Sequence, residues 1–466
     1  MATQIKSNKT YQGDAAALPS PQAPMPKLAS LYLDFEKELY IALGRTTGNA
    51  IRSRRLADVV TFTRASETTR VNKSGLIEYL ASGEAAIEYD PITGECLGLR
   101  VAAGVTNLAA NSENFSGTTW TKSGVSTTAA KTIAPDGNVS ASPFNESTDS
   151  ADTVHFMQEN STPAPTVGSP VTFSIFAKAN TASVIQLVAQ GAVTTTQFAN
   201  FDLVNGLRTR SSSGILQTSM RKYKNGWYRL SITITPAGTA SPQFTLALVN
   251  DVTSAAALPA YTGTGKGVYI WGAQIENWDG VTPYIPTAGA TVTRPDEVCT
   301  VRTDLDFMAA DRGAVFADYN MPASLQAMSG VYNAGQAIVC LDNDSVAEYV
   351  NFMNRRISNS ITNQNLTAAA KIVGSSEITV EVKRLGQVRN GHQSFISSFI
   401  NDDMRVFDGI NKYSGAPLVS TQLNRLMIGR ARTTPAAVSN AYLKRLVYYP
   451  VTLADADLVS QFNALS

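Results

Sequence analysis

Residues 228–236 read YRLSITITP, and the order of residue types in this stretch decides the fold class. Apolar side chains occupy every second position from Tyr228 to Ile234, polar side chains stand between them, and Pro236 ends the run. A two-residue alternation places successive side chains on opposite faces of a strand, so one face can fill a core. Residues 171–175 and 244–248 repeat the alternation. Many such short strands, separated by Gly, Pro and Ser turns, predict an all-β protein built of antiparallel β-sandwiches of the jelly-roll kind.

The length and composition predict several domains with few charges. The chain has 466 residues, more than the ~250–300 at which one hydrophobic core stops growing. Charged residues make up 16% of the chain, against ~25% in an average soluble domain. The formal net charge of +1 excludes a strong global attraction to nucleic acid or to an anionic membrane. We therefore expect no nucleic-acid partner.

Three features bear on the compartment in which the chain is made. No run approaches the ~20 apolar residues of a membrane span, so none is expected. The first residues lack the apolar stretch of a secretion signal. Cys96, Cys299 and Cys340 are far apart and odd in number, which gives neither a disulfide framework nor a paired zinc motif. We expect buried thiols, no metal, no cofactor, and assembly in a reducing cytoplasm.

Changes of pattern along the chain predict four segments. They are an extended arm rich in Ala and Pro (1–27), a small strand-rich module (28–105), a jelly roll (106–298) and a second β-sandwich (299–466). The arm is interpreted either as a disordered tail or as a strand that orders only against a partner. The module is short for a core of its own and is expected to lean on a neighbour. The second sandwich is expected to end in a short helix that buries Leu458 and Phe462.

Two series of short motifs run in order along the chain. The first is TFTRAS (61–66), GLI (75–77), YDP (89–91) and GECLGL (94–99); the second is TNL (106–108), SENF (112–115), WTK (120–122), NGWYR (225–229), YIWGAQIE (269–276) and PYIPT (283–287). The first series resembles a module of structural proteins of tailed bacteriophages, and the second resembles a carbohydrate-binding-module-like jelly roll in those proteins. The last block resembles a concanavalin- or laminin-G-like sandwich in its strand at 442–446 and its terminal helix.

The resemblance implies a structural component of a bacteriophage virion, most simply a tail fibre or other tail appendage that attaches to the particle by its N-terminus. Its partners would be other tail, baseplate or neck proteins, neighbouring copies in a homo-oligomer with a trimer favoured, and host cell-surface polysaccharide. Two alternatives remain open at this point: a glycan depolymerase tailspike, and a ligand-free decoration protein of the head or tail.

The residue types that carry catalysis are sparse, and we expect no enzyme. The two histidines, His155 and His392, lie in different predicted domains, and the chain has no G-x-S-x-G elbow. Glu146, Asp149 and Asp152 are close enough in sequence either to ligate calcium or to form a solvated acidic loop. The residues therefore favour binding or scaffolding over chemistry.

All four tryptophans lie in the predicted jelly roll, where an exposed ring could stack on a sugar. Trp227 and Trp271 stand within apolar strand patterns, so we expect them in the core. Trp120 and Trp278 stand near turns and are the candidate carbohydrate-binding residues.

Overall fold

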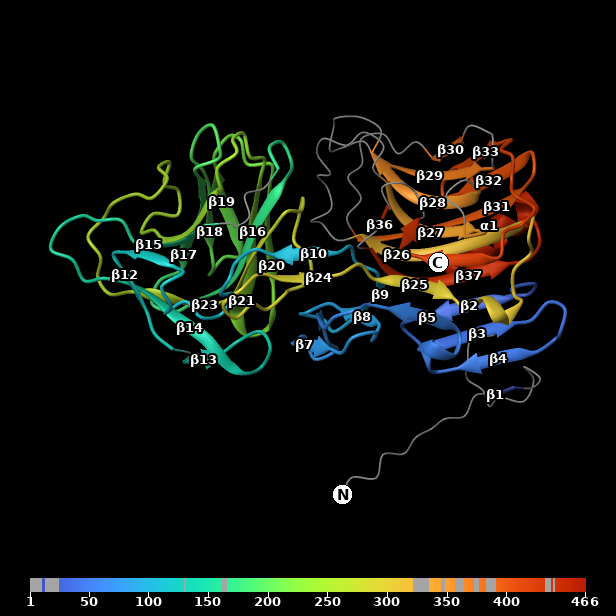
Figure 1. Cartoon of the computed structure of the whole chain (residues 1–466), viewed down its shortest axis with the longest axis horizontal. Coiled ribbons are helices and arrows are strands. Elements are labelled where there is room, and N and C mark those ends of the chain that lie inside the picture. The colour runs from blue at the N-terminus through green and yellow to red at the C-terminus, as the bar shows by residue number, and fades with distance from the viewer. Residues whose placement is uncertain are drawn as a thin grey trace, which may run out of the picture.

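The computed structural model describes residues 11–12, 25–129, 131–160, 166–321, 335–344, 348–356, 364–372, 377–382, 391–431, 437–438 and 441–466. Two β-sandwiches stand side by side along the long axis of the molecule (Figure 1). The strands β10 (Val105–Asn107) and β24 (Val292–Arg294) pair with each other and run between the sandwiches. All strand pairs among the described residues are antiparallel, which confirms the predicted all-β fold class.

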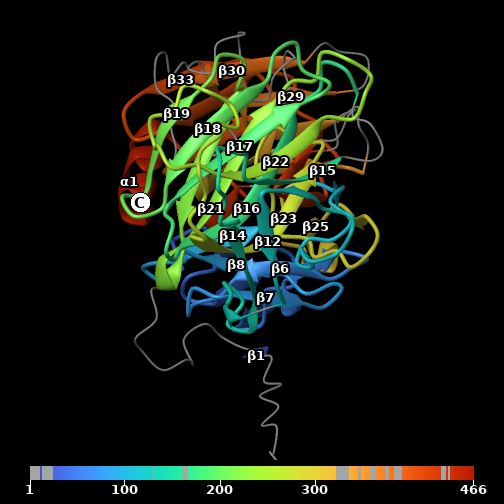
Figure 2. The same cartoon turned by 90° about the vertical axis from the view of Figure 1, so that its left-hand side faces the viewer.

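The first sandwich is a jelly roll whose two sheets come from one continuous part of the chain; Figure 2 views it from its outer side. One sheet has the order β11 (Thr121–Ser123), β15 (Phe156–Asn160), β22 (Gln243–Leu248), β17 (Val184–Gln190), β18 (Gln197–Asp202), β19 (Leu207–Ser211). The other has the order β12 (Val125–Thr127), β14 (Val139–Glu146), β23 (Gly267–Glu276), β16 (Val171–Ala179), β21 (Trp227–Ile234), β20 (Gln217–Lys222), with β13 (Thr132–Ile133) beside β14. Fully buried side chains such as Phe173, Leu187 and Leu246 fill the space between them.

The stretch that decided the fold class forms β21. Its apolar residues Leu230, Ile232 and Ile234 lie in the jelly-roll core, as the alternation predicted. Its polar positions are buried as well, and Arg229 is only 5% exposed. The outer face of this sheet is therefore covered by another part of the chain, a feature that alternation alone does not predict.

The second sandwich has two larger sheets. One has the order β1 (Tyr11–Gln12), β4 (Ala50–Ser53), β3 (Leu39–Leu43), β2 (Leu31–Asp34), β37 (Tyr442–Tyr449), β26 (Gly313–Met321), β31 (Gly391–Ile400), β32 (Asp403–Phe407), β33 (Lys412–Gly415), with β8 (Ala86–Tyr89) and β9 (Cys96–Arg100) branching from β37. The other has the order β30 (Ile378–Val382), β29 (Gln364–Lys371), β28 (Tyr349–Arg356), β27 (Gly335–Asp342), β34 (Arg425–Ile428), β25 (Val298–Val301), β5 (Val60–Thr63). A short pair, β35 (Arg430–Ala431) and β36 (Ala437–Val438), lies beside β27.

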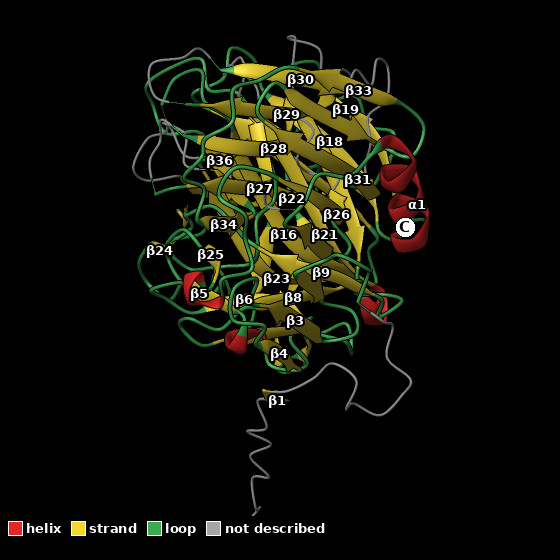
Figure 3. Ribbon diagram, turned by 90° about the vertical axis from the view of Figure 1, so that its right-hand side faces the viewer, coloured by secondary structure: helices red, strands yellow, loops and turns green. Residues whose placement is uncertain are grey.

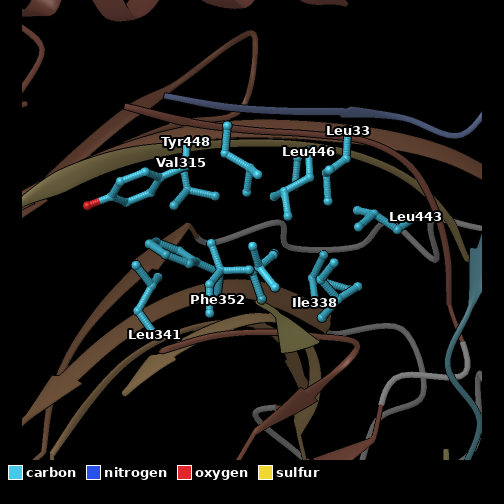
Figure 4. Close-up of a cluster of buried hydrophobic side chains, with 14 of the residues drawn as sticks. Leu33, Val315, Ile338, Leu341, Phe352, Leu443, Leu446 and Tyr448 are labelled. Atoms are coloured by element: carbon cyan, nitrogen blue, oxygen red, sulfur yellow. The ribbon is translucent and has the colours of Figure 1, made fainter. Parts of the chain in front are cut away.

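The core of this sandwich is a layer of apolar side chains from both sheets. Figure 4 shows Val315 and Leu446 from one sheet facing Ile338 and Phe352 from the other. None of these four side chains is more than 2% exposed. The interior is thus closed and dry in the way that a packed sandwich requires.

The strands of the small module predicted over residues 28–105, which was expected to lean on a neighbour, pair with strands from the C-terminal part of the chain. β2 and β9 both pair with β37, the last strand of the chain, and β5 pairs with β25. Because these short strands have too little apolar area for a core of their own, they complete the two C-terminal sheets instead. The second sandwich is therefore built from both ends of the chain, and the jelly roll is inserted between them.

Residues 28–105 also contain a hairpin that belongs to none of the four large sheets. It consists of β6 (Thr68–Val71) and β7 (Ile77–Leu80). Gly75 lies in its turn at φ 79°, where a side chain would be strained. A Cβ at this position would also stand 2.3 Å from the carbonyl oxygen of Pro91, so only glycine fits.

The chain ends in the predicted helix, α1 (Asp455–Leu465), which lies against the outer face of the larger sheet (Figure 3). Leu458 and Phe462 are buried there beside Phe316 and Phe407, which confirms the predicted stripe. No helix among the described residues is long and apolar enough to cross a membrane.

The arm predicted over residues 1–27 lies mostly outside the described residues. Of it, β1 pairs antiparallel with β4, with Tyr11 opposite Arg52 and Gln12 opposite Ile51. Met25 packs against the apolar cluster under α1. The arm's role as an anchor stays a prediction.

Candidate functional site

The structure separates the two tryptophans that were candidates for sugar contact. Trp120 is 2% exposed, its ring packs 5.4 Å from that of Phe115, and its Nε1 donates to the Asn111 carbonyl at 3.0 Å. The prediction for Trp120 is therefore wrong, because no face of its ring is open to a ligand. Trp227 and Trp271 are 1% and 0% exposed, so their predicted place in the interior is confirmed.

Trp278 is half-buried in the loop that follows β23. Its carbonyl oxygen accepts from Thr172 Oγ1 at 2.8 Å, and its backbone nitrogen donates to the Glu276 carbonyl at 2.8 Å. The indole Nε1 is buried and has no hydrogen-bond partner among the described residues. Trp278 keeps part of its ring accessible and remains a candidate for ligand contact.

The acidic segment 146–152 forms a hydrogen-bonded loop network. Glu146 accepts from Tyr261 Oη at 2.5 Å and from the backbone nitrogen of Thr264 at 2.7 Å. Burial alone would raise the pKa of Glu146, but these hydrogen bonds outweigh it and lower the pKa. Asp152 accepts separately from Thr262 Oγ1 at 2.6 Å. The described residues contain no group of three His, Cys, Asp or Glu side chains placed to hold a metal ion.

The two histidines lie in different sandwiches, as predicted. His155 is 1% exposed, and its Nε2 lies 2.7 Å from Asp149 Oδ2. Hydrogen bonds from His155 and then Ser147 lower the pKa of Asp149. Because Ser147 contacts Asp149 and not the imidazole, these three residues lack the order of a nucleophile–base–acid triad.

A seam of buried apolar side chains lies between the two sandwiches. The β6–β7 hairpin lays Val71 and Ile77 against the outer face of the β14–β23–β16–β21 sheet. There they meet a buried aromatic cluster formed by Phe176, Tyr223, Trp227, Trp271 and Tyr284. The rings of Trp271 and Tyr284 lie 4.6 Å apart, and that of Phe176 lies 5.3 Å from Trp271. The polar side chain of Arg229 on β21 is covered instead by the loop that follows β23, where its Nη1 donates to the Thr282 carbonyl at 2.8 Å.

Hydrogen bonds fix the hairpin in the seam. The backbone nitrogen of Ile77 donates to the Pro135 carbonyl at 2.9 Å, and Thr69 Oγ1 donates to the Tyr284 carbonyl at 2.6 Å. Lys224 Nζ donates to the Ser74 carbonyl at 2.6 Å. Apolar packing and directional bonds thus both join the hairpin to the jelly roll.

One side of the seam carries an exposed aromatic ring among carboxylates, which we call the Tyr79 patch: Tyr79, Glu67, Glu113 and Asp136. Tyr79 lies within β7, between the buried residues Ile77 and Leu80, and is 45% exposed. Burial of part of the ring, and then the charges of Glu113, Asp136 and Glu67, raise the pKa of the Tyr79 hydroxyl. Tyr79 therefore presents part of an aromatic ring to solvent, within range of the charges of three carboxylates.

Glu113 links the patch to the aromatic cluster beneath it. Its Oε1 accepts from Tyr284 Oη at 2.8 Å. Burial raises the pKa of the Glu113 carboxyl, and the hydrogen bond from Tyr284 opposes that effect. Asp136 is held by its own turn, in which it accepts from the backbone nitrogen of Asn138 at 3.0 Å. Glu113 and Asp136 are thus held in position by their surroundings.

Comparisons with known proteins add little to this description. No protein-family model matches the chain, and none of the curated proteins matches it. Among solved structures, domains LG4-5 of the mouse laminin α1 chain match with 9% sequence identity and a TM-score of 0.21, over 79% of this chain and 91% of that chain. The LG1-3 region of the laminin α2 chain matches with 10% identity and a TM-score of 0.20, over 66% of each chain. Scores of this size carry no argument about function.

Proposed function

We propose that this chain is a non-enzymatic structural component of a tailed-bacteriophage virion, a tail fibre or appendage protein that presents two rigidly joined β-sandwiches. The observation that carries the proposal is the seam. A buried aromatic cluster on one sandwich is covered by a hairpin that is continuous in sequence with the other. A firm junction suits a part that holds its shape on a particle, whereas domains joined by a small polar contact move freely. The phage assignment itself rests on the motif series in the sequence.

The arm is proposed as the attachment to the particle, where it would contact tail, baseplate or neck proteins and neighbouring copies. Its test is removal of residues 1–24, a truncation that keeps Met25 in its contact with the second sandwich. We expect loss of incorporation into particles with an unchanged melting temperature of the purified chain. Normal incorporation of the truncated protein would overturn the anchoring role.

Host polysaccharide is proposed as the ligand, and the Tyr79 patch as its contact. A half-exposed aromatic ring can stack on the apolar face of a pyranose, and the adjoining carboxylates can accept sugar hydroxyl groups. The test is binding of the full chain to an array of bacterial surface polysaccharides. We expect Tyr79→Ala to weaken binding at least tenfold. The matched control is Ile410→Ala, which also removes an exposed apolar side chain, one that is 72% exposed in the second sandwich.

The same experiment separates the rival functions. Equal binding by Tyr79→Ala and Ile410→Ala would remove the patch from the proposal. Silence of the parent chain on every polysaccharide would favour a ligand-free decoration protein. Release of reducing sugar ends from a bound polysaccharide would favour a depolymerase and would overturn the non-enzymatic assignment.

A further inference from the structure

A buried cluster of ionic side chains lies where the chain passes between the two sandwiches. It contains three arginines and two glutamates: Arg64, Arg100, Arg294, Glu88 and Glu297. Each of them is no more than 5% exposed. Charges buried to this degree must be paired, because an unpaired charge out of water is strongly destabilising.

Both carboxylates of the cluster are fully engaged. Glu297 Oε1 lies 3.2 Å from Arg64 Nη1 and 3.5 Å from Arg100 Nη2, and its Oε2 accepts from the backbone nitrogen of Ala102 at 2.8 Å. Glu88 Oε1 contacts Arg100 Nη1, and its Oε2 accepts from the backbone nitrogen of Val71 at 2.9 Å. Arg64 and Arg100 are therefore each paired with at least one carboxylate.

Arg294 is the arginine that these contacts leave out. Its Nη2 donates to the Ala103 carbonyl at 2.7 Å. Its Nε and Nη1 are buried and have no hydrogen-bond partner among the described residues. A guanidinium carries one N–H on Nε and two on each terminal nitrogen, so three donors of Arg294 lack an acceptor. Burial lowers the pKa of Arg294 to about 10, and the side chain stays charged at neutral pH.

Nearby carboxylates do not make up the missing charge. Three arginines against two glutamates leave the cluster one positive charge in excess. Asp296 is near Arg294, but its Oδ2 pairs with Arg430 Nη1 at 2.8 Å. Glu276 is attracted chiefly to Arg229, and its own burial already raises its pKa. A water molecule could accept hydrogen bonds from Arg294 but could not neutralise it.

We propose that the unpaired donors of Arg294 bind a small inorganic anion of the size of chloride. A small ion is proposed because the cluster is almost fully buried, and an anion because charge-assisted hydrogen bonds from a guanidinium suit one. Arg294 ends β24 and is paired with Val105 of β10, the two strands that connect the sandwiches. The anion would therefore fix the crossing point of the chain, and its binding would stabilise the junction.

The first test is the thermal unfolding of the full chain at constant ionic strength, with sodium chloride replacing sodium gluconate in steps. Gluconate is too large for the site. A ligand that binds only the folded state raises the melting temperature with its concentration, by roughly 1–2 °C for each tenfold increase above the dissociation constant when the whole chain unfolds in one transition. We expect Arg294→Met to abolish this dependence and Arg208→Met, on the exposed strand β19, to keep it. Equal melting temperatures of the parent chain in both salts would overturn the proposal.

A second measurement holds even where Arg294→Met fails to fold. Crystals of the unaltered chain grown in sodium bromide are expected to give an anomalous peak within hydrogen-bond distance of Arg294 Nε and Nη1. An ordered water at that place, with no anomalous signal, would overturn the anion site. Neither test depends on the virion assignment, so the two proposals fail separately.

Discussion

The two sandwiches share a two-layer architecture but take their strands from the chain in different ways. The jelly roll uses one continuous stretch, from β11 to β23, and several of its strands were anticipated from local alternation. The second sandwich pairs β2, near the start of the chain, with β37, near its end. The comparison teaches that residue pattern identifies a strand, whereas its neighbours depend on contacts between distant parts of the chain.

The sandwiches also differ in what covers their outer faces. The jelly roll has an aromatic outer face covered by the β6–β7 hairpin, and the second sandwich has an apolar outer face covered by α1. The β6–β7 hairpin joins the two sandwiches, whereas α1 covers a sheet of the sandwich to which it belongs. The predictions below test whether this difference couples the stability of the two sandwiches.

The largest effect is expected from Trp271→Ala. Trp271 is fully buried in the aromatic cluster of the seam, and removing a core aromatic side chain costs about 3–5 kcal/mol. Because the lost contact joins the two units, we expect the parent chain to unfold in one calorimetric transition and the variant in two. The control is Phe173→Ala, which removes a fully buried ring from the jelly-roll core and leaves the seam intact. Two transitions in the parent chain would contradict coupling through the seam.

The second effect concerns Glu159, a jelly-roll carboxyl that is 5% exposed. Its Oε1 accepts from the backbone nitrogen of Ala110 at 2.8 Å, and burial raises its pKa to about 7. A carboxyl whose pKa is raised in the folded state stabilises below its ordinary pKa of 4.5, and this stabilisation is lost as pH rises towards 7. The loss amounts to about 3 kcal/mol.

The variant Glu159→Gln removes the ionisable group and so tests this pH-dependent loss of stability. The variant is expected to match the parent chain at pH 4 and to have the larger free energy of unfolding at pH 8, measured by denaturant titration. Glu146→Gln serves as the comparison, because the pKa of Glu146 is lowered and its contribution is lost on acidification instead. If the difference in the free energy of unfolding between the parent chain and Glu159→Gln does not change with pH, the pH dependence does not come from Glu159.

The smallest effect concerns His392 of the second sandwich. His392 is 52% exposed and contacts Asp318, whose hydrogen bond raises the pKa of the imidazole. This stabilisation is fully present below the ordinary pKa of 6.5 and is lost as pH rises through the higher folded value. Since the pair is partly solvated, the amplitude is under about 1 kcal/mol. A double-mutant cycle with His392→Gln and Asp318→Asn measures the coupling energy of the pair at pH 5.5 and at pH 9. Equal coupling energies at the two pH values would contradict a stabilising pair.

The sequence predicted those features of the fold that depend on nearest neighbours along the chain. Alternation located β21, and the spacing of Leu458 and Phe462 located the buried side of α1. It also placed Trp227 and Trp271 in the interior. Trp120 was misjudged because its turn-like neighbours suggested exposure, whereas the ring folds back onto Phe115.

The seam and the sites beside it were not predictable from the sequence. The Tyr79 patch gathers side chains from residues 67 to 136, and the ionic cluster gathers them from residues 64 to 297. Nothing in the spacing of Arg294 distinguishes it from the other arginines. Its significance comes from burial and from the absence of an acceptor at Nε and Nη1 among the described residues, both of which exist only in the folded chain.

The pairing of β10 with β24 has a consequence for how such a molecule could diversify. Asn107 stands opposite Val292, so the point where the jelly roll begins and the point where it ends are adjacent. Partners in an antiparallel ladder have Cα atoms about 4.5–5.5 Å apart, a distance that a two-residue turn closes. Another fold with neighbouring termini could thus be joined to the second sandwich at this place without cutting one of its strands, provided that it also covers Val71 and Ile77 of the hairpin.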